Sequence, residues 1–129
     1  MGVIAVQVAS PPLEFGIVAF GANASGSCLY STSIRGKAYL AAGQGAEASA
    51  ELRKILDRGG IVWNCWTAAL AHLAVAQANA SQARTSHGAE ADAARARALA
   101  AYKDFLALWK DADSDIPILT QAKAEYAKL

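Results

Sequence analysis

The sequence predicts an all-α protein, and three observations carry the prediction. Of the 129 residues, 54% are hydrophobic, and 32 residues are alanine, which has the highest helix propensity. Valine and isoleucine together number only 13, which gives little support for a sheet. From about residue 29 onward, apolar residues recur at helical spacing between glycine-rich or short polar breaks. A chain of this length is expected to form one domain with its own core.

Charge and hydropathy argue against several classes of partner. The chain carries 12 basic and 11 acidic residues, so its formal net charge of +1 gives no electrostatic footprint for nucleic acid. No stretch approaches the ~18 apolar residues of a membrane span. We therefore expect a protein or peptide partner, or a second copy of the chain, and neither nucleic acid nor membrane.

The cysteines and histidines do not form a metal-binding pattern. Cys28 and Cys65 lie 37 positions apart without the CxxC spacing, and neither His72 nor His87 has metal-motif spacing to them. We expect no metal and no cofactor. The spacing favours two reduced, mostly buried thiols and leaves a disulfide open.

The first residues differ from the rest of the chain. An apolar run is broken by Pro11-Pro12, and the first basic residue is Arg35, so a secretory signal is not indicated and we expect a cytoplasmic location. We expect residues 1–12 to be a leader, either a short strand or irregular, and residues 13–129 to form the helical domain. Residues 13–20 fit a first helix or an irregular cover, and residues 21–27 fit a loop.

Residues 34–56, within a first hairpin of about 29–57, organise the domain. In its first helix, Tyr30, Ile34 and Ala38 fall on one face. Gly43 is expected to end that helix because glycine adopts positive φ without strain. A second helix follows at once, with its inner face made by Ala48, Leu52, Ile55 and Leu56.

An elongated second hairpin is expected over about 67–111. An apolar connector with two tryptophans leads into residues 67–84, which are helical by pattern. A break at residues 85–88 precedes a second alanine-rich helix, and the alternative is one long helix through the break. We expect the tryptophans to fill the core between hairpins, and the alternative is that they are exposed anchors for a partner: Trp63, Trp66 and Trp109.

A closing helix of about 116–128 follows an acidic turn. Pro117 is tolerated in its first turn, where the missing N–H would have no partner. In this turn Asp111, Asp113 and Asp115 occupy alternate positions, as aspartates do in a calcium-binding loop. The turn lacks the glycine and the final glutamate of such a loop, so we expect a solvated turn.

Small, aromatic and aliphatic residues recur at the positions that define a tetratricopeptide repeat. In the first hairpin these are Gly36, Tyr39, Gly43, Ala48, Leu52 and Ile55. In the second they are Ala76, Ala98, Tyr102 and Phe105, with Asn79 in place of the aromatic residue. The pattern is typical of antiparallel helical hairpins stacked in an α-α superhelix, with the last helix as a C-terminal cap.

The match extends beyond the generic repeat. Five stretches of the chain resemble the C-terminal tetratricopeptide region of bacterial serine/threonine kinases and winged-helix regulators of the acidobacterial type. They are GSCLY, RGKAYLAAGQGAEASAE, KILDRGGIV, ALAHL and the segment 101–129. The resemblance implies a non-catalytic helical segment. The chain has no Gly-rich phosphate loop and no HRD or DFG triplet, so kinase activity does not follow and we expect no enzyme.

Two functions from different classes fit these observations. The first is a helical-repeat scaffold that binds a protein or peptide on its concave side, where the repeat register places Tyr30, Ser33, Lys37, Gln77 and Ser81. The second is a structural module that associates with itself, as a homodimer or larger homo-oligomer, through its helical arms.

Overall fold

The chain is entirely helical over the residues that the computed structural model describes, which are 28–62 and 65–129. This confirms the all-α prediction for that part of the chain, while residues 1–27 and Trp63 lie outside it. No helix within it has the length and apolar character needed to cross a membrane. In order, the helices are α4 (Tyr30–Ala41), α5 (Gly45–Leu56), the single turn α6 (Gly59–Val62), α7 (Trp66–Thr85), α8 (Gly88–Leu108) and α9 (Pro117–Tyr126).

α4 and α5 form an antiparallel hairpin because α4 ends in a glycine cap. Gly43 has φ of 75°, its N–H donates to the Leu40 carbonyl, and the Gln44 N–H donates to the Tyr39 carbonyl. These two hydrogen bonds make a Schellman motif, which satisfies carbonyls that a helix end otherwise leaves unpaired. The prediction that Gly43 ends the first helix is confirmed.

Small residues bring α4 and α5 close together. A Cβ atom on Gly36 would lie 2.5 Å from Cγ of Leu52, so only glycine leaves room for this leucine. Ala48 is fully buried in the same hairpin, and Leu52 and Ile55 are almost fully buried. The short side chains on one helix thus make space for the large ones on the other.

α7 and α8 form a longer antiparallel hairpin. α7 ends at Thr85 and α8 begins at Gly88, so the alternative of one continuous helix is wrong. At the open end of the hairpin, Nε1 of Trp109 donates to the Ala69 carbonyl at 3.2 Å. Near its middle, Nε of Arg97 donates to Oδ1 of Asn79 at 3.0 Å.

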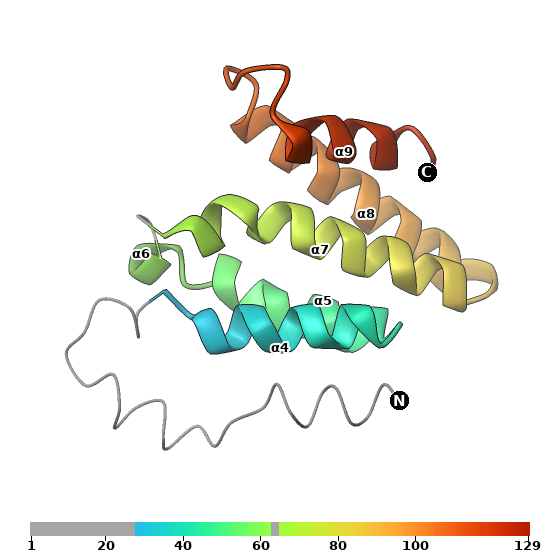
Figure 1. The fold of residues 1–129 in the computed structure, drawn as a ribbon. Helices are drawn as coiled ribbons and strands as arrows, with labels where there is room; N and C mark the ends of the chain where they lie inside the picture. The colour runs from blue at the N-terminus through green and yellow to red at the C-terminus, as the bar shows by residue number, and fades with distance from the viewer. Residues whose placement is uncertain (1–27, 63–64) are drawn as a thin grey trace.

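The helices lie in two layers (Figure 1). α4, α7 and α9 run in the same direction, while α5 and α8 run in the opposite direction and lie behind them in this view. The hairpins meet through α5 and α7, where a Cβ atom on Gly45 would lie 2.4 Å from the backbone nitrogen of Gln82. The α5 backbone therefore packs directly against the α7 backbone.

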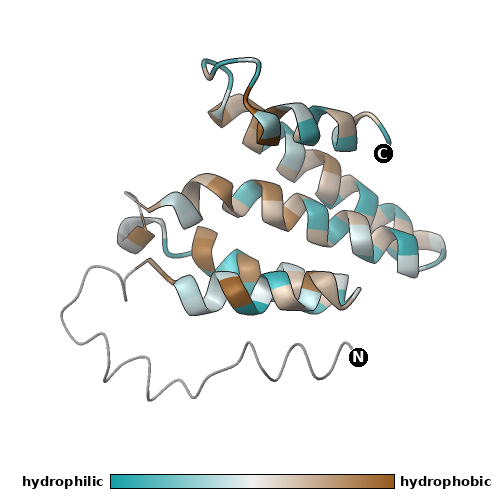
Figure 2. Ribbon diagram, viewed as in Figure 1, coloured by the Kyte–Doolittle hydropathy of each residue, from teal (hydrophilic) through white to brown (hydrophobic). Residues whose placement is uncertain are grey.

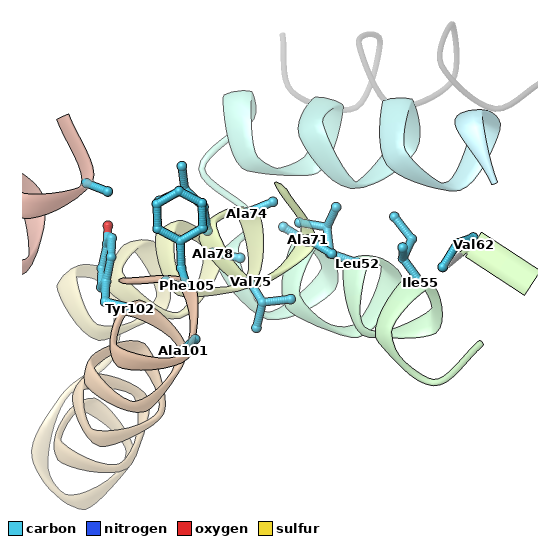
Figure 3. Close-up of a cluster of buried hydrophobic side chains, with 14 of the residues drawn as sticks. Leu52, Ile55, Val62, Ala71, Ala74, Val75, Ala78, Ala101, Tyr102 and Phe105 are labelled. Carbon is cyan, nitrogen blue, oxygen red and sulfur yellow. The ribbon is translucent and has the colours of Figure 1, made fainter. Parts of the chain in front are cut away.

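The core lies between the two layers (Figure 3). Apolar side chains from α5, α7 and α8 point toward one another there, and the repeat positions predicted for the second hairpin belong to this buried set. The large or close-packing members are Leu52, Ile55, Val62, Ala71, Leu73, Val75, Ala76, Ala98, Tyr102 and Phe105.

Two expectations about side chains are wrong. Cys28 and Cys65 are not reduced thiols but form a disulfide, with 5.6 Å between their Cα atoms. They meet because Cys28 lies just before α4 and Cys65 lies just before α7, and these two helices start at the same end of the molecule. Trp66 does not fill the core, since it is 50% exposed. Trp109 is partly buried, with its ring centroid 5.2 Å from that of Phe105.

Candidate partner-binding face

The side of the molecule formed by α4, α7 and α9, here called the groove face, contains two hollows. The smaller, the apolar hollow, has a volume of about 210 Å³ and lies along the N-terminal halves of these helices. Trp66, Leu70 and Ile118 line it from α7 and α9, and Lys37 lines it from α4. It offers a mainly apolar site with one cation at its edge.

The larger hollow, the basic hollow, has a volume of about 710 Å³ and lies toward the C-terminal ends of the same helices. Three cationic side chains line it: Arg84 from the last turn of α7, Arg95 from α8, and Lys128 just after α9. Figure 2 shows hydrophilic residues gathered toward this end of the α7–α8 hairpin. The volume lies within the ~300–1,000 Å³ range usual for ligand pockets.

The two hollows share one residue, Gln77, so they are neighbours along α7. Nε2 of Gln77 donates to Oε2 of Glu125 at 3.0 Å, which ties α7 to α9 at the boundary between the hollows. A single extended segment is therefore able to reach both hollows by following α7.

The structure distributes the five predicted contact residues along this face. Ser33 and Lys37 line the apolar hollow, Ser81 lines the basic hollow, and Gln77 lines both. Tyr30 lines neither, although its ring lies 5.6 Å from that of Trp66. Both serines are only 5% exposed, so they offer little surface to a partner.

Lys37 and Trp66 form one exposed contact at the edge of the apolar hollow. Nζ of Lys37 lies 5.2 Å from the centroid of the Trp66 ring, within the range of a cation–π interaction. The disulfide anchors the chain next to this pair, and Oγ1 of Thr67 donates to the Cys28 carbonyl at 2.7 Å. These links hold the start of α7 against the start of α4 and fix the half-exposed indole in place.

Glu125 fixes α9 on the groove face. Its carboxylate accepts hydrogen bonds from Gln77, from the Tyr102 hydroxyl at 2.9 Å and from Gln121 at 2.7 Å. Burial alone would raise the pKa of Glu125, but these donors and the charge of Lys128 outweigh it, so the pKa is lowered. Burial and the adjacent carboxylate raise the pKa of Tyr102. Glu125 therefore stays ionised and Tyr102 stays neutral near neutral pH.

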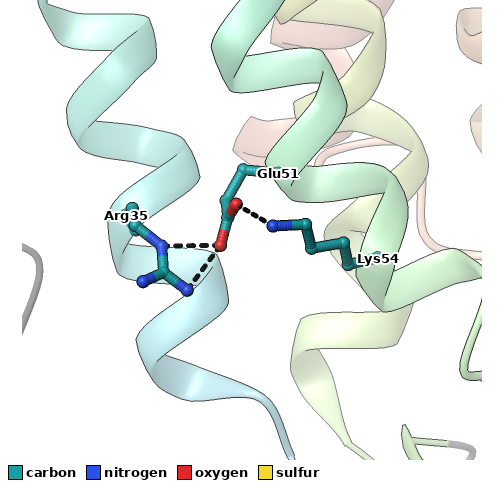
Figure 4. Close-up of polar contacts among 3 residues, drawn as sticks. All are labelled: Arg35, Glu51 and Lys54. Carbon is teal, nitrogen blue, oxygen red and sulfur yellow. Dashed lines mark hydrogen bonds and ion pairs between the residues drawn. The ribbon is translucent and has the colours of Figure 1, made fainter. Parts of the chain in front are cut away.

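A second ion-paired cluster joins α4 to α5 (Figure 4). Glu51 receives hydrogen bonds from Arg35 across the hairpin and from Lys54 on its own helix. Burial opposes the ionised form of Glu51, but the two cations lower its pKa overall. Lys54 lies three residues after Glu51 on the same helix, whereas Arg35 lies on the other helix of the hairpin and no local sequence pattern indicates its contact. This cluster is structural because its charges are already paired.

The described residues do not assemble a metal-binding constellation. They contain no group of three or more His, Cys, Asp or Glu side chains placed to hold a metal ion. Nδ1 of His72 lies 3.9 Å from Oδ2 of Asp104, beyond hydrogen-bond distance, and Asp104 is largely exposed. The arrangement is suited to binding through shape, charge and the exposed indole.

Sequence reasoning missed the three cations of the basic hollow, and it gave the exposure of Trp66 only as the alternative to core filling. Arg84, Arg95 and Lys128 lie far apart in the sequence and meet only because α7 and α9 run in the same direction beside α8. The available signal was Arg84, the basic residue in the last turn of α7.

The chain matches no family model, no curated protein and no solved structure. The relation to tetratricopeptide regions of bacterial kinases and regulators therefore stays a prediction from the residues.

Proposed function

We propose that this chain is a non-catalytic helical-repeat scaffold of tetratricopeptide type that binds a protein or peptide on its groove face. The observation that carries the proposal is the pair of adjoining hollows along α7, one apolar and one basic, which share Gln77. A surface with an apolar anchor point beside a polar rim is the usual anatomy of a protein-recognition site.

The helix arrangement supports the repeat assignment. Antiparallel hairpins meet through their second and third helices, and the first helix of each hairpin lies on the same side of the molecule (Figure 1). The contact between Gly36 and Leu52 provides the close helix crossing expected at those repeat positions. α9 runs in the same direction as α7 and is joined to it by the hydrogen bond from Gln77 to Glu125, which fits a closing helix that continues the array (Figure 1).

Self-association is the second candidate. Two large apolar side chains are exposed outside the hollows, Ile34 at 57% and Leu108 at 64%. Ile34 lies on α4 and Leu108 lies on α8. A homodimer or larger homo-oligomer would bury one of these side chains against a second copy of the chain.

The disulfide bears on location. Stable disulfides are typical of oxidising compartments and rare in the cytosol of mesophiles. The Cys28–Cys65 bond thus weighs against the cytoplasmic location that we expected from the sequence. Alkylation of free thiols in freshly lysed source cells tests this, because a cytoplasmic, reduced chain would take up two labels and an oxidised chain none.

The binding proposal is tested by selecting ligands from a random-peptide library with the oxidised chain and measuring their affinity for Lys37→Glu. Lys37 is exposed, lines the apolar hollow and contacts Trp66, so its reversal should weaken binding without lowering the melting temperature. Lys103→Glu is the control, because Lys103 is exposed on α8 and lines neither hollow. Equal effects of the two variants, or no selected ligand, would contradict the proposal.

A further inference from the structure

The basic hollow concentrates positive charge on a chain that is nearly neutral overall. Arg84, Arg95 and Lys128 reach it from three different elements, and all three side chains are exposed. None of them forms an ion pair or a side-chain hydrogen bond with another residue in the described ranges 28–62 and 65–129. Elsewhere Arg35 and Lys54 are both paired with Glu51.

The single acidic side chain that lines the hollow does not neutralise these cations. Glu125 is held by donors from Gln77, Tyr102 and Gln121, so its oxygens are already engaged in fixing α9. Three cationic side chains against one acidic side chain leave the side chains of the lining with a formal charge of +2.

We propose, building on the peptide-binding function above, that the basic hollow binds an acidic segment of a partner protein, with Arg84, Arg95 and Lys128 contacting its aspartate or glutamate carboxylates. Two of the three cations are arginines, whose planar guanidinium groups bind carboxylates through paired hydrogen bonds. An apolar residue of the same segment enters the adjoining apolar hollow beside Trp66.

The shape of the site favours an acidic peptide over nucleic acid. The three cations line one hollow of about 710 Å³ and come from three different elements, so they do not form a track along one helix. Nucleic-acid binding depends on many phosphate contacts along a backbone, which a chain of net charge +1 does not offer. A few carboxylates held in one hollow match the number of cations present.

The chain has an acidic segment of its own, the exposed aspartates Asp111, Asp113 and Asp115 between α8 and α9. This turn precedes the start of α9, whereas the basic hollow lies toward the end of α9, so the turn does not fill the hollow of its own molecule. Docking of this turn into the hollow of a second copy is the competing occupant that the experiment separates.

The experiment compares two charge reversals at equivalent places. Arg84→Glu changes an exposed arginine in the last turn of α7, inside the basic hollow. Arg53→Glu changes an exposed arginine in the last turn of α5, outside both hollows, and carries the same unfavourable interaction with the helix dipole. Peptides selected from a random library are labelled with fluorescein and titrated with each variant by fluorescence anisotropy.

The inference predicts selected peptides rich in aspartate and glutamate, about tenfold weaker binding to Arg84→Glu, unchanged binding to Arg53→Glu, and loss of affinity with added salt. Arg95→Gln, which removes a charge from the middle of α8 without reversing it, supplies a second variant if Arg84→Glu melts earlier than Arg53→Glu.

The other outcomes overturn distinct statements. Peptides without acidic bias that bind Arg84→Glu normally but bind Lys37→Glu poorly would overturn the acidic ligand and leave the peptide-binding function standing. Absence of any selected peptide would overturn both. A solution mass that rises with concentration and becomes monomeric on Asp113→Asn would assign the hollow to a second copy and overturn the assignment to a separate partner.

Discussion

Gly45 is the residue at which the packing of the two hairpins is most sensitive. A Cβ atom there would lie 2.4 Å from the Gln82 backbone nitrogen and 2.6 Å from the Ala78 carbonyl oxygen. Ordinary contacts begin at 3.4 Å, so Gly45→Ala requires α5 and α7 to separate by 3.4 − 2.4 = 1.0 Å. Both obstructing atoms belong to the backbone of α7, and no side-chain rotation relieves the clash.

The cost follows from what that separation disrupts. Overpacking of this kind costs ~1–3 kcal/mol. Opening the interface also lengthens the 3.2 Å hydrogen bond from Asn79 to Ser49, a contribution of ~0.5–1.5 kcal/mol. The higher helix propensity of alanine offsets up to ~1 kcal/mol of this destabilisation. We expect Gly45→Ala to lower the free energy of unfolding by ~1–3 kcal/mol, which lowers the melting temperature by ~4–12 °C in a domain of this size.

Thermal denaturation followed by circular dichroism measures the effect, with Gly59→Ala as the matched control. A Cβ atom on Gly59 meets nothing within 4 Å, and this glycine does not have positive φ. The control should be neutral or stabilising by up to ~1 kcal/mol. Equal melting temperatures for the two variants would refute the direct packing of α5 on α7.

Three further predictions concern the disulfide, the Glu51 cluster and the core. Replacing Cys28 and Cys65 with serine should cost ~4 kcal/mol, because the bond closes a 37-residue loop; a melting temperature unaffected by reductant would contradict this. The pKa of Glu51 is lowered from 4.5, so its stabilisation is complete above about that pH and is lost as the pH falls through the folded-state pKa; urea unfolding of Glu51→Gln should show a shallower acid-side loss than the parent chain. Leu52→Ala, at 1% exposure, should cost ~2–5 kcal/mol by urea denaturation, and a loss below ~0.5 kcal/mol would mean that the hairpin register is wrong.

Local signals in the sequence were sufficient for the hairpins. Gly43 ends α4 because a glycine after an apolar helix provides the positive φ that the cap needs. The small residue at Gly36 and the large one at Leu52 are recognisable from their spacing, and their contact follows from helix geometry. These features depend on residues close together in the chain, where periodicity and cap chemistry act directly.

Long-range packing set the features that the sequence did not predict. The contact of Gly45 with α7 depends on how the two hairpins dock, which local sequence patterns do not indicate. The same docking brings Cys28 to Cys65, although their separation in the sequence carries no geometric information.

In the candidate site, the sequence predicted which way side chains point but not how far they are buried. Periodicity placed Ser33 and Ser81 on the groove face, yet neighbouring helices leave each only 5% exposed. Helical spacing gives the direction in which a side chain points but not how far the next helix covers it. Among the residues that line the two hollows, the exposed side chains of Lys37, Arg84 and Arg95 offer a partner a positive charge.

The central claim is that a partner binds the face formed by α4, α7 and α9, and peptide titration monitored by amide chemical shifts tests it most directly. A selected peptide added to the ¹⁵N-labelled, oxidised chain should shift the amides of Lys37, Gln77 and Arg84, which line the hollows. The amides of Arg53 and Lys103, which lie outside both hollows on α5 and α8, should stay unchanged. Shifts confined to residues of α5 and α8 that line neither hollow, such as Arg53 and Lys103, would contradict the account and place recognition elsewhere.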